Sequence, residues 1–300
     1  MEYISLPRVI ICKDVNMIEK DVYDELVNVG LERVADKLIC LAKKCVRFET
    51  EPLDKKDVPI GVSKIGGLPD LPETCQWPTW QNIHLSFLCQ INLHDLAVYS
   101  CCNTLPSVGW LYFFYDPEQR TWGFDPKDRG SWCVIYHNGA CSDLTRREYP
   151  SDEHEIYTPC CISHCETLSL PGWNDSDIEN LLNDEELDCY RDFMDESISL
   201  YPNNTKHQVL GVPNSLQGDM QLECQLVANG VYCGDANAYQ DSRRKTLEAG
   251  KEDWHLLFQL DSDENAEMMW GDCGRLYFWI QSQNLLKRNF AEVWMILQCG

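Results

Sequence analysis

The residue types best suited to catalysis meet in one short string, Trp270-Gly271-Asp272-Cys273-Gly274. Asp272 could act as a general acid or base, and Cys273 could act as a nucleophile if a nearby base or cation lowered its pKa. The alternative is structural, because a turn between two glycines commonly uses its Asp to bind backbone amides ahead of a strand. We favour the turn, since such turns are common and activated cysteines are rare.

A second group of chemically capable residues is the cluster of Cys160, Cys161, His164 and Cys165. Its three sulfurs and one imidazole could bind zinc, but the chain has no C-x-x-C pair, the spacing that structural zinc sites usually carry twice. The alternative, which we favour, is a strand with small, half-buried cysteines. No metal is therefore predicted. No cofactor is predicted either, because G-x-G-x-x-G, the P-loop, H-E-x-x-H and G-x-S-x-G are all missing.

The charge of the chain restricts its partners. With 48 acidic and 25 basic residues, the net charge is −23, which repels nucleic-acid phosphates and anionic lipid headgroups. Ten of the acids lie between Asp175 and Glu196, against one base, Arg191. Such runs are usually solvated faces, but a dense acidic face also speeds association with a basic protein. The candidate residues for binding a partner are Glu185, Glu186 and Asp188.

Two helical regions are expected around these residues. Apolar residues recur at helical spacing in the region of about 14–46, with an interruption at Gly30, which predicts two helices or one kinked helix. The acidic region of about 174–198 holds two capping-box patterns, which predict short helices after Ser176 and after Asn183.

The rest of the chain is predicted to form mainly strands. β-branched and aromatic runs are separated by Gly, Pro and Asp, which is typical of β structure. We expect strands at 45–50, 84–93, 109–116, 131–137, 209–213, 220–227, 253–261, 274–281 and 292–299. The predicted class is α+β, mainly β, with helices at the N-terminus and in the middle.

The predicted strands fall into two similar sets. Phe87-Leu-Cys-Gln90-Ile-Asn92 resembles Leu256-Leu-Phe-Gln259-Leu-Asp261, and 109–114 resembles 274–279. We therefore predict one domain, 1–300, built from two similar β units, an internal pseudo-duplication with halves at about 47–170 and 205–300. Gln90 and Gln259 occupy matching positions. They would either satisfy neighbouring backbone groups or form a polar centre shared between the halves.

These segments also resemble the YwqG-like family. Its first signature is similar to Ser63-Lys-Ile-Gly-Gly-Leu-Pro-Asp-Leu-Pro72, followed by Trp77-Pro78 and Leu88-Cys-Gln-Ile-Asn-Leu93. The second half is similar at Leu216-Gln-Gly-Asp219, at 254–263 and best at Met269-Trp-Gly-Asp-Cys-Gly274. The resemblance covers roughly residues 60–300 and implies a compact, mainly β fold with flanking helices. The family is one of unknown function, so the resemblance implies no catalytic residue.

The turns that carry this resemblance supply further candidates. Asp219 joins Asp272 and Cys273 as a catalytic candidate, and Gln217 and Trp270 join the two matched glutamines as binding candidates. The apolar stretch Val9–Cys12 is too short for a signal peptide or a membrane span, so a cytoplasmic protein is expected.

Two functional hypotheses follow from these residues. One is a binding protein whose acidic face holds a basic partner, of which an inhibitor-like or immunity-like role is one form. The other is an enzyme of unrecognised class, with its site at the junction of the two β halves.

Overall fold

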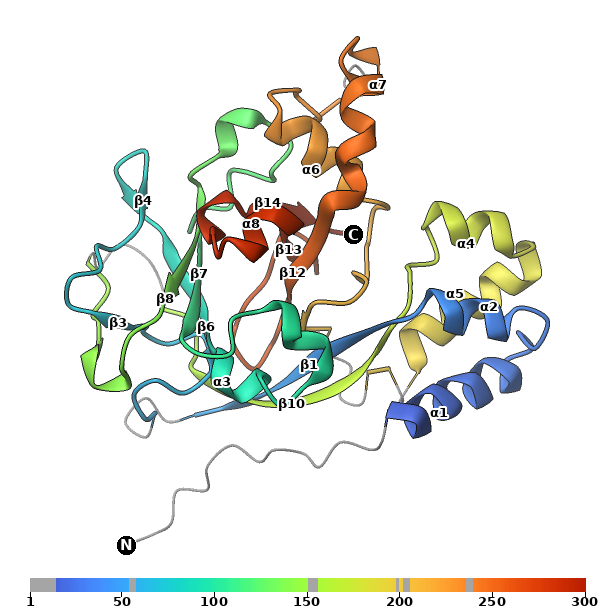
Figure 1. The fold of residues 1–300 in the computed structure, drawn as a ribbon, viewed down its shortest axis with the longest axis horizontal. Helices are drawn as coiled ribbons and strands as arrows, with labels where there is room; N and C mark the ends of the chain where they lie inside the picture. The colour runs from blue at the N-terminus through green and yellow to red at the C-terminus, as the bar shows by residue number, and fades with distance from the viewer. Residues whose placement is uncertain (1–14, 54–57, 151–155, 198–199, 202–205, 236–239) are drawn as a thin grey trace, which may run out of the picture.

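The computed structural model describes residues 15–53, 58–150, 156–197, 200–201, 206–235 and 240–300. Within them, most of the structure is sheet, with eight α-helices (Figure 1). The helices are α1 (Val15–Asn28), α2 (Ala35–Leu41), α3 (Leu93–Leu96), α4 (Ser176–Leu181), α5 (Asp184–Glu196), α6 (Gln221–Ala228), α7 (Arg244–Leu247) and α8 (Ser282–Leu286). The mixed, mainly β class expected from the sequence is confirmed.

One ten-stranded sheet forms the body of the protein, and all of its neighbouring strands are antiparallel. Its strands, in spatial order, are β14 (Trp294–Gln298), β13 (Arg275–Gln281), β12 (Trp254–Asp261), β11 (Gln208–Val209), β1 (Lys43–Pro52), β10 (Cys160–Ser169), β2 (Lys64–Ile65), β6 (Ser86–Asn92), β7 (Trp110–Tyr115) and β8 (Trp132–His137). Two small sheets pair β3 (Asp70–Pro72) with β9 (Leu144–Arg146) and β4 (Thr79–Trp80) with β5 (Ile83–His84).

The large sheet curls until its two edge strands approach each other, which gives a nearly closed, barrel-like shape (Figure 1). Tryptophan side chains and a backbone hydrogen bond from the Leu297 N–H to the Trp122 carbonyl, at 3.1 Å, close the sheet in place of a ladder between the edge strands. The Trp132 and Trp294 rings lie 4.9 Å apart between centroids. Trp132 Nε1 donates to the Val293 carbonyl at 2.9 Å, and Trp294 Nε1 donates to the Gly123 carbonyl at 2.8 Å. Tryptophans can bridge the edges in this way because each one combines a large apolar ring with a polar N–H.

Four apolar clusters lie within the described structure, and the two largest are its main cores. The larger fills the curled sheet, where Phe113 lies 4.8 Å from Phe258 and 5.0 Å from Phe278 between ring centroids. The smaller core joins α1, α2, α4 and α5 to the end of β10. These four helices lie together to one side of the sheet, at the right in Figure 1. Each has one apolar face, so burying those faces against one another is the main source of their stability.

The predicted helical regions are found, one predicted strand is wrong, and the strand expected at 209–213 is reduced to the two residues of β11. Gly30 separates α1 from α2, and the capping box after Asn183 opens α5, where the Asn183 side chain accepts from the Glu186 N–H at 2.9 Å. The run 220–227, expected as a strand, is the helix α6. Its apolar residues fit both periods, and a short run of this kind cannot be assigned by periodicity alone.

Among the residues that the structure describes, no helix is both long enough and apolar enough to span a lipid bilayer.

Candidate functional site

Gln90, on β6, is fully buried, and its side-chain amide forms hydrogen bonds with backbone groups. Its Oε1 accepts from the Asp70 N–H at 2.8 Å, and its Nε2 donates to the Val62 carbonyl at 2.7 Å. Nε2 also lies 2.8 Å from Asp70 Oδ2. The side chain therefore ties the segment before β3 to the sheet, and this pairing supplies the partners that buried polar groups require.

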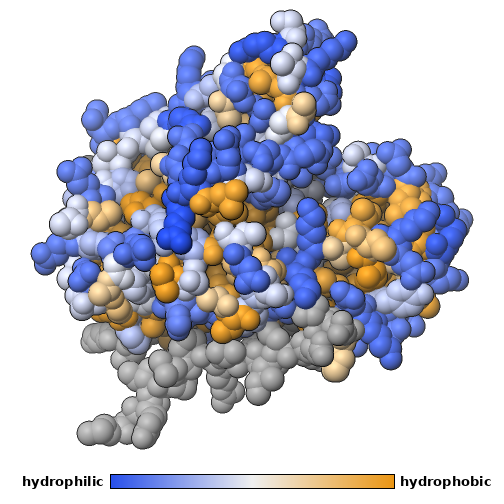
Figure 2. All heavy atoms as spheres, viewed as in Figure 1, coloured by the Kyte–Doolittle hydropathy of each residue, from blue (hydrophilic) through white to orange (hydrophobic). Residues whose placement is uncertain are grey.

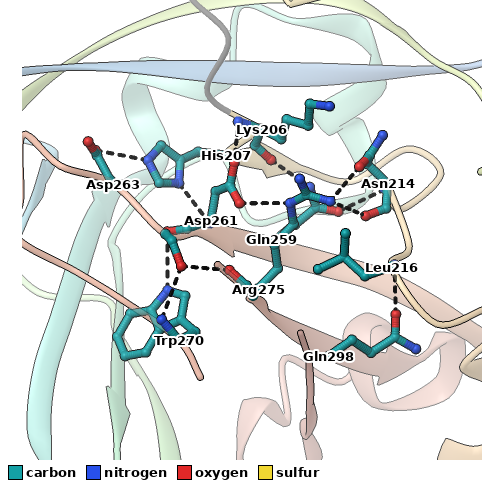
Figure 3. Close-up of polar contacts among 12 residues, drawn as sticks. Lys206, His207, Asn214, Leu216, Gln259, Asp261, Asp263, Trp270, Arg275 and Gln298 are labelled. Carbon is teal, nitrogen blue, oxygen red and sulfur yellow. Dashed lines mark hydrogen bonds and ion pairs between the residues drawn. The ribbon is translucent and has the colours of Figure 1, made fainter. Parts of the chain in front are cut away.

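Gln259, on β12, makes the same pair of contacts in the other half of the sheet (Figure 3). It is also fully buried, its Oε1 accepts from the Asn214 N–H at 2.9 Å, and its Nε2 donates to the Lys206 carbonyl at 2.6 Å. No described hydrogen bond joins the two glutamines or their partners to each other. Each glutamine thus satisfies backbone groups within its own part of the sheet.

The charges beside the two glutamines are themselves buried. Asp70 contacts Lys64 Nζ at 3.0 Å and Arg146 Nε at 2.5 Å, and both Asp70 and Lys64 are at most 1% exposed. Burial lowers the pKa of Lys64 to about 8, although Asp70 opposes this shift. Burial raises the pKa of Asp70, but its bonds to Arg146 and Lys64 outweigh burial and bring that pKa below its usual value. In the part of the sheet that holds Gln259, Arg275 Nε donates to Asp261 Oδ1 at 2.7 Å.

His207 and Asp263 form a buried pair in which both ring nitrogens of the histidine have partners within the protein. The ring Nε2 lies 3.1 Å from Asp263 Oδ2, and the ring Nδ1 lies 3.0 Å from the Asp261 backbone nitrogen. A backbone N–H can only donate, so Nδ1 is the acceptor and Nε2 carries the proton. Neither nitrogen is left to act as a base toward a substrate. The pair therefore fixes the start of β11 against the end of β12 (Figure 3).

The string Trp270–Gly274 forms a tight turn before β13. Trp270 is buried and its Nε1 donates to the Asp261 carbonyl at 3.1 Å. The Gly274 N–H closes the turn on the Trp270 carbonyl at 2.7 Å. Asp272 and Cys273 are exposed, and neither side chain has a hydrogen-bond or ion-pair partner among the described residues. No described contact connects them to Gln90, Gln259 or Asp219.

Gln217 and Asp219 lie on the loop that precedes α6, beside the C-terminal strand. Gln217 Nε2 donates to the Cys299 carbonyl at 2.9 Å, and its N–H donates to Gln298 Oε1 at 3.0 Å. Partial burial and the neighbouring carboxylate of Asp175 raise the pKa of Asp219 to about 6. Two carboxyl groups that share a proton in this way join the loop to the start of the acidic helices.

This carboxyl pair predicts a specific dependence of stability on pH. Folded Asp219 holds its proton more tightly than the unfolded chain, so the stability that this proton adds is lost as the pH rises from about 4 through about 6. Asp219→Asn should therefore raise the midpoint of thermal unfolding near pH 7.5 and change it little near pH 4. Asp272→Asn, at an exposed carboxyl without a partner, is the matched control and should leave both midpoints unchanged. An equal response of the two variants at both pH values would contradict the coupling.

The four residues of the cysteine cluster do not converge. They lie on β10, along which buried and half-buried residues alternate, with Cys160 and His164 buried and Cys161 and Cys165 half-buried. Successive side chains of a strand point to opposite faces of the sheet, so the cluster divides into two pairs. Within the described ranges, no group of three or more His, Cys, Asp or Glu residues is placed to hold a metal ion.

The acidic residues of the middle region form an outer face on α4 and α5. Hydrophilic residues cover this outer edge of the helices, at the right of the view in Figure 2. Glu186 is paired with Arg33, which lowers the pKa of Glu186 to about 2. Asp188 lies 3.3 Å from Arg191, whereas Glu185 is exposed with no ion-pair partner among the described residues. The three candidates thus lie on one helix, but only Glu186 and Asp188 form ion pairs with described residues.

Sequence reasoning missed the buried charges. Buried charges occur in strands at Arg47, Lys64, Asp70 and Arg275, whereas a strand with one solvent-facing side would place such residues in water. The available signal was a charge within an apolar run, as in Cys-Val-Arg47-Phe. That signal could not show that elements distant in the sequence cover both faces of the sheet.

Comparison with known proteins identifies the family and nothing more specific. No curated protein matches the chain. A family model described as a domain of unknown function, DUF1963, matches residues 63–299. The match includes every strand of the large sheet except β1, which lies in the middle of that sheet. Because the match spans most of the sequence, this chain belongs to the DUF1963 family, a family of unknown function.

Proposed function

We propose that this protein is a cytoplasmic binding protein of the YwqG-like kind, which holds a basic protein partner on the outer face of α5. The observation that carries the proposal is the position of the acids along this helix. Asp192 and Glu196, in its C-terminal half, are exposed and have no ion-pair partner among the described residues. The last turn of α5 contains no basic residue.

Helix stability accounts for some of these acids and not for others. Asp184, Glu185 and Glu186 lie in the first turn, where the helix dipole favours negative charge. Asp192 and Glu196 lie where the dipole disfavours it. The spacing Asp188, Asp192, Glu196 also places like charges four residues apart, and each such pair costs about 0.2–0.5 kcal/mol. The stripe formed by Asp188, Asp192 and Glu196 thus destabilises the helix. A role in binding accounts for it, because an acidic face attracts and selects a basic partner.

The test compares two variants with the same change in charge. The stripe variant is Asp192→Asn with Glu196→Gln, and the control, in the segment between β12 and β13, is Glu264→Gln with Asp272→Asn. The probe is a short lysine-rich peptide, with affinity measured by fluorescence anisotropy at fixed ionic strength. The stripe variant should lose about tenfold in affinity, which is about 1.4 kcal/mol, and should unfold at a higher temperature. The control should lose less than about twofold in affinity and should unfold at nearly the same temperature, because both acids are exposed and have no ion-pair partner among the described residues.

Equal losses of affinity in the two variants would contradict the proposal, because they would show attraction to net charge alone. A stripe variant that is less stable than the original protein would also contradict it, since the acids would then have a structural role.

We also propose that the sheet is built from two similar β units. The matched hydrogen bonds of Gln90 and Gln259 support this proposal, and so does the arrangement of the strands. The order β2-β6-β7-β8 outward from the centre of the sheet parallels the order β11-β12-β13-β14 on the other side. A bulge interrupts β6 between Phe87 and Cys89, and a bulge interrupts β12 between Leu256 and Phe258, at matching positions.

The turns before the matched strands provide further support for two units. Gly66 N–H donates to the Leu88 carbonyl at 2.8 Å, and Leu210 N–H donates to the Leu257 carbonyl at 3.3 Å. Both Gly66 and Leu210 have positive φ, at 71° and 61°. The pairing of Ile65 with Cys89 and of Val209 with Phe258 makes Gly66 equivalent to Leu210.

A further inference from the structure

Arg47 is a buried cation without a hydrogen-bond partner. It lies in the middle of β1, is 2% exposed, and none of its three guanidinium nitrogens has a partner among the described residues. A guanidinium group stays protonated in proteins. The effective cost of burying an ion is several kcal/mol when nothing compensates its charge. The surroundings of Arg47 therefore need an additional source of negative charge.

The residues around Arg47 add positive charge rather than removing it. The Arg47 guanidinium carbon lies 4.4 Å from the centroid of the Tyr201 ring, and Lys206 Nζ lies 4.6 Å from the same centroid. A cation–π contact supplies about 0.5–2 kcal/mol, which is less than the cost of burial. The carboxylates that interact with Lys206 are already paired, Asp261 with Arg275 and Asp195 with Lys206 itself. Neither forms an ion pair with Arg47.

A buried acceptor without a partner lies next to this cation. Gln208 is opposite Arg47 in the register of β1 and β11, so the two side chains stand on the same face of the sheet. The Gln208 Nε2 donates to the Leu210 and Val212 carbonyls, but its Oε1 has no partner among the described residues. The site thus offers several donors on two cations and one acceptor that needs a hydrogen.

We propose that Arg47 and Lys206 bind inorganic phosphate beside Tyr201. The planar guanidinium can donate two parallel hydrogen bonds to two oxygens of one tetrahedral anion. Lys206 adds a second charge on a flexible stem. At neutral pH phosphate keeps at least one P–O–H group, which can donate to Gln208 Oε1. Sulfate and acetate carry no such hydrogen at neutral pH, so the unpaired acceptor favours phosphate over these two anions. This site is separate from the acidic face of α5 and does not depend on it.

The test measures thermal unfolding of the full chain in sodium phosphate, sodium sulfate and sodium chloride, at equal ionic strength near pH 7. Phosphate should raise the unfolding midpoint above that in sulfate, and sulfate should raise it no further than a general salt effect does. Arg47→Met should remove the difference between phosphate and sulfate. In chloride this variant should be at least as stable as the original protein, because it removes an uncompensated buried charge.

Two further variants make the result decisive. Lys206→Gln keeps a polar side chain and should weaken phosphate binding on the order of tenfold by calorimetry, which tests the site even if Arg47→Met does not fold. Arg243→Met, at an exposed arginine paired with Asp241, should keep the full response to phosphate. Equal midpoints in phosphate and sulfate would overturn the assignment to phosphate. An Arg47→Met protein that keeps the phosphate response would overturn the site.

Discussion

Replacing Asp70 by alanine is expected to lower the free energy of unfolding by about 3–5 kcal/mol near pH 6.5. The carboxylate is fully buried and contacts Lys64 at 3.0 Å, and Lys64 is itself 1% exposed. Without Asp70, the ammonium group would remain buried with no compensating charge. Arg146, the Gly61 N–H and Gln90 would lose the same acceptor. Urea unfolding followed by tryptophan fluorescence measures the loss, since the chain has ten tryptophans.

The same variant should recover part of its stability as the pH rises. In the original protein the pKa of Lys64 is about 8, below that of an unfolded lysine, so stability increases with pH above about 8. Asp70 raises that pKa, and its removal should lower the pKa further. Lys64 in the variant would then lose its charge nearer to neutral pH. The deficit in unfolding free energy should therefore be smaller near pH 9.5 than near pH 6.5.

Lys64→Met provides the matched control for Asp70→Ala. It removes the buried ammonium but leaves Asp70 bound to Arg146 and to the Gly61 N–H, so it should cost less than about 2 kcal/mol. The double variant should be more stable than Asp70→Ala alone, because no charge is left buried at position 64. A deficit that stays constant with pH, or a double variant with fully additive losses, would show that the pair is not coupled.

Gly123→Ala is expected to cost at least about 3 kcal/mol of unfolding free energy, because two effects combine at the closing contact of the sheet. Gly123 has a φ of 85°, a conformation that costs an L-residue about 1–2 kcal/mol. A Cβ at this position would also lie 1.9 Å from the Met295 carbonyl oxygen, which belongs to β14. The alanine would push the loop away from the edge strand and weaken the bond from Trp294 Nε1 to the Gly123 carbonyl.

Gly30→Ala isolates the conformational part of this effect. Gly30 has a similar φ of 89°, but an added Cβ there would meet no atom within 4 Å. Its expected cost is about 1 kcal/mol, again measured by urea unfolding. Similar costs for the two variants would mean that the loop at Gly123 yields easily and that the sheet is not held closed there.

Local features of this protein could be predicted from neighbouring residues. The capping box at Asn183 marked the start of α5, and the break at Gly30 marked the boundary between α1 and α2, because these signals act through the backbone of the same few residues. The aromatic strands β6, β7, β12 and β13 were also predicted. Alternation and β-branched composition are local properties as well. The helix α6 was missed because its short apolar run fits either period.

The sequence by itself determined the excess of acidic charge, the two helical regions, most of the long strands and the matching glutamines. The tertiary structure decided what those residues contact. Gln90 and Gln259 bind backbone groups 28 and 53 residues away, and β1 pairs with both β10 and β11, which lie far along the chain. The tertiary structure also buries the Arg47 side chain and brings Arg47 and Lys206 to the ring of Tyr201. Burial of a charge depends on what covers it, and here the covering residues come from segments that no local pattern connects.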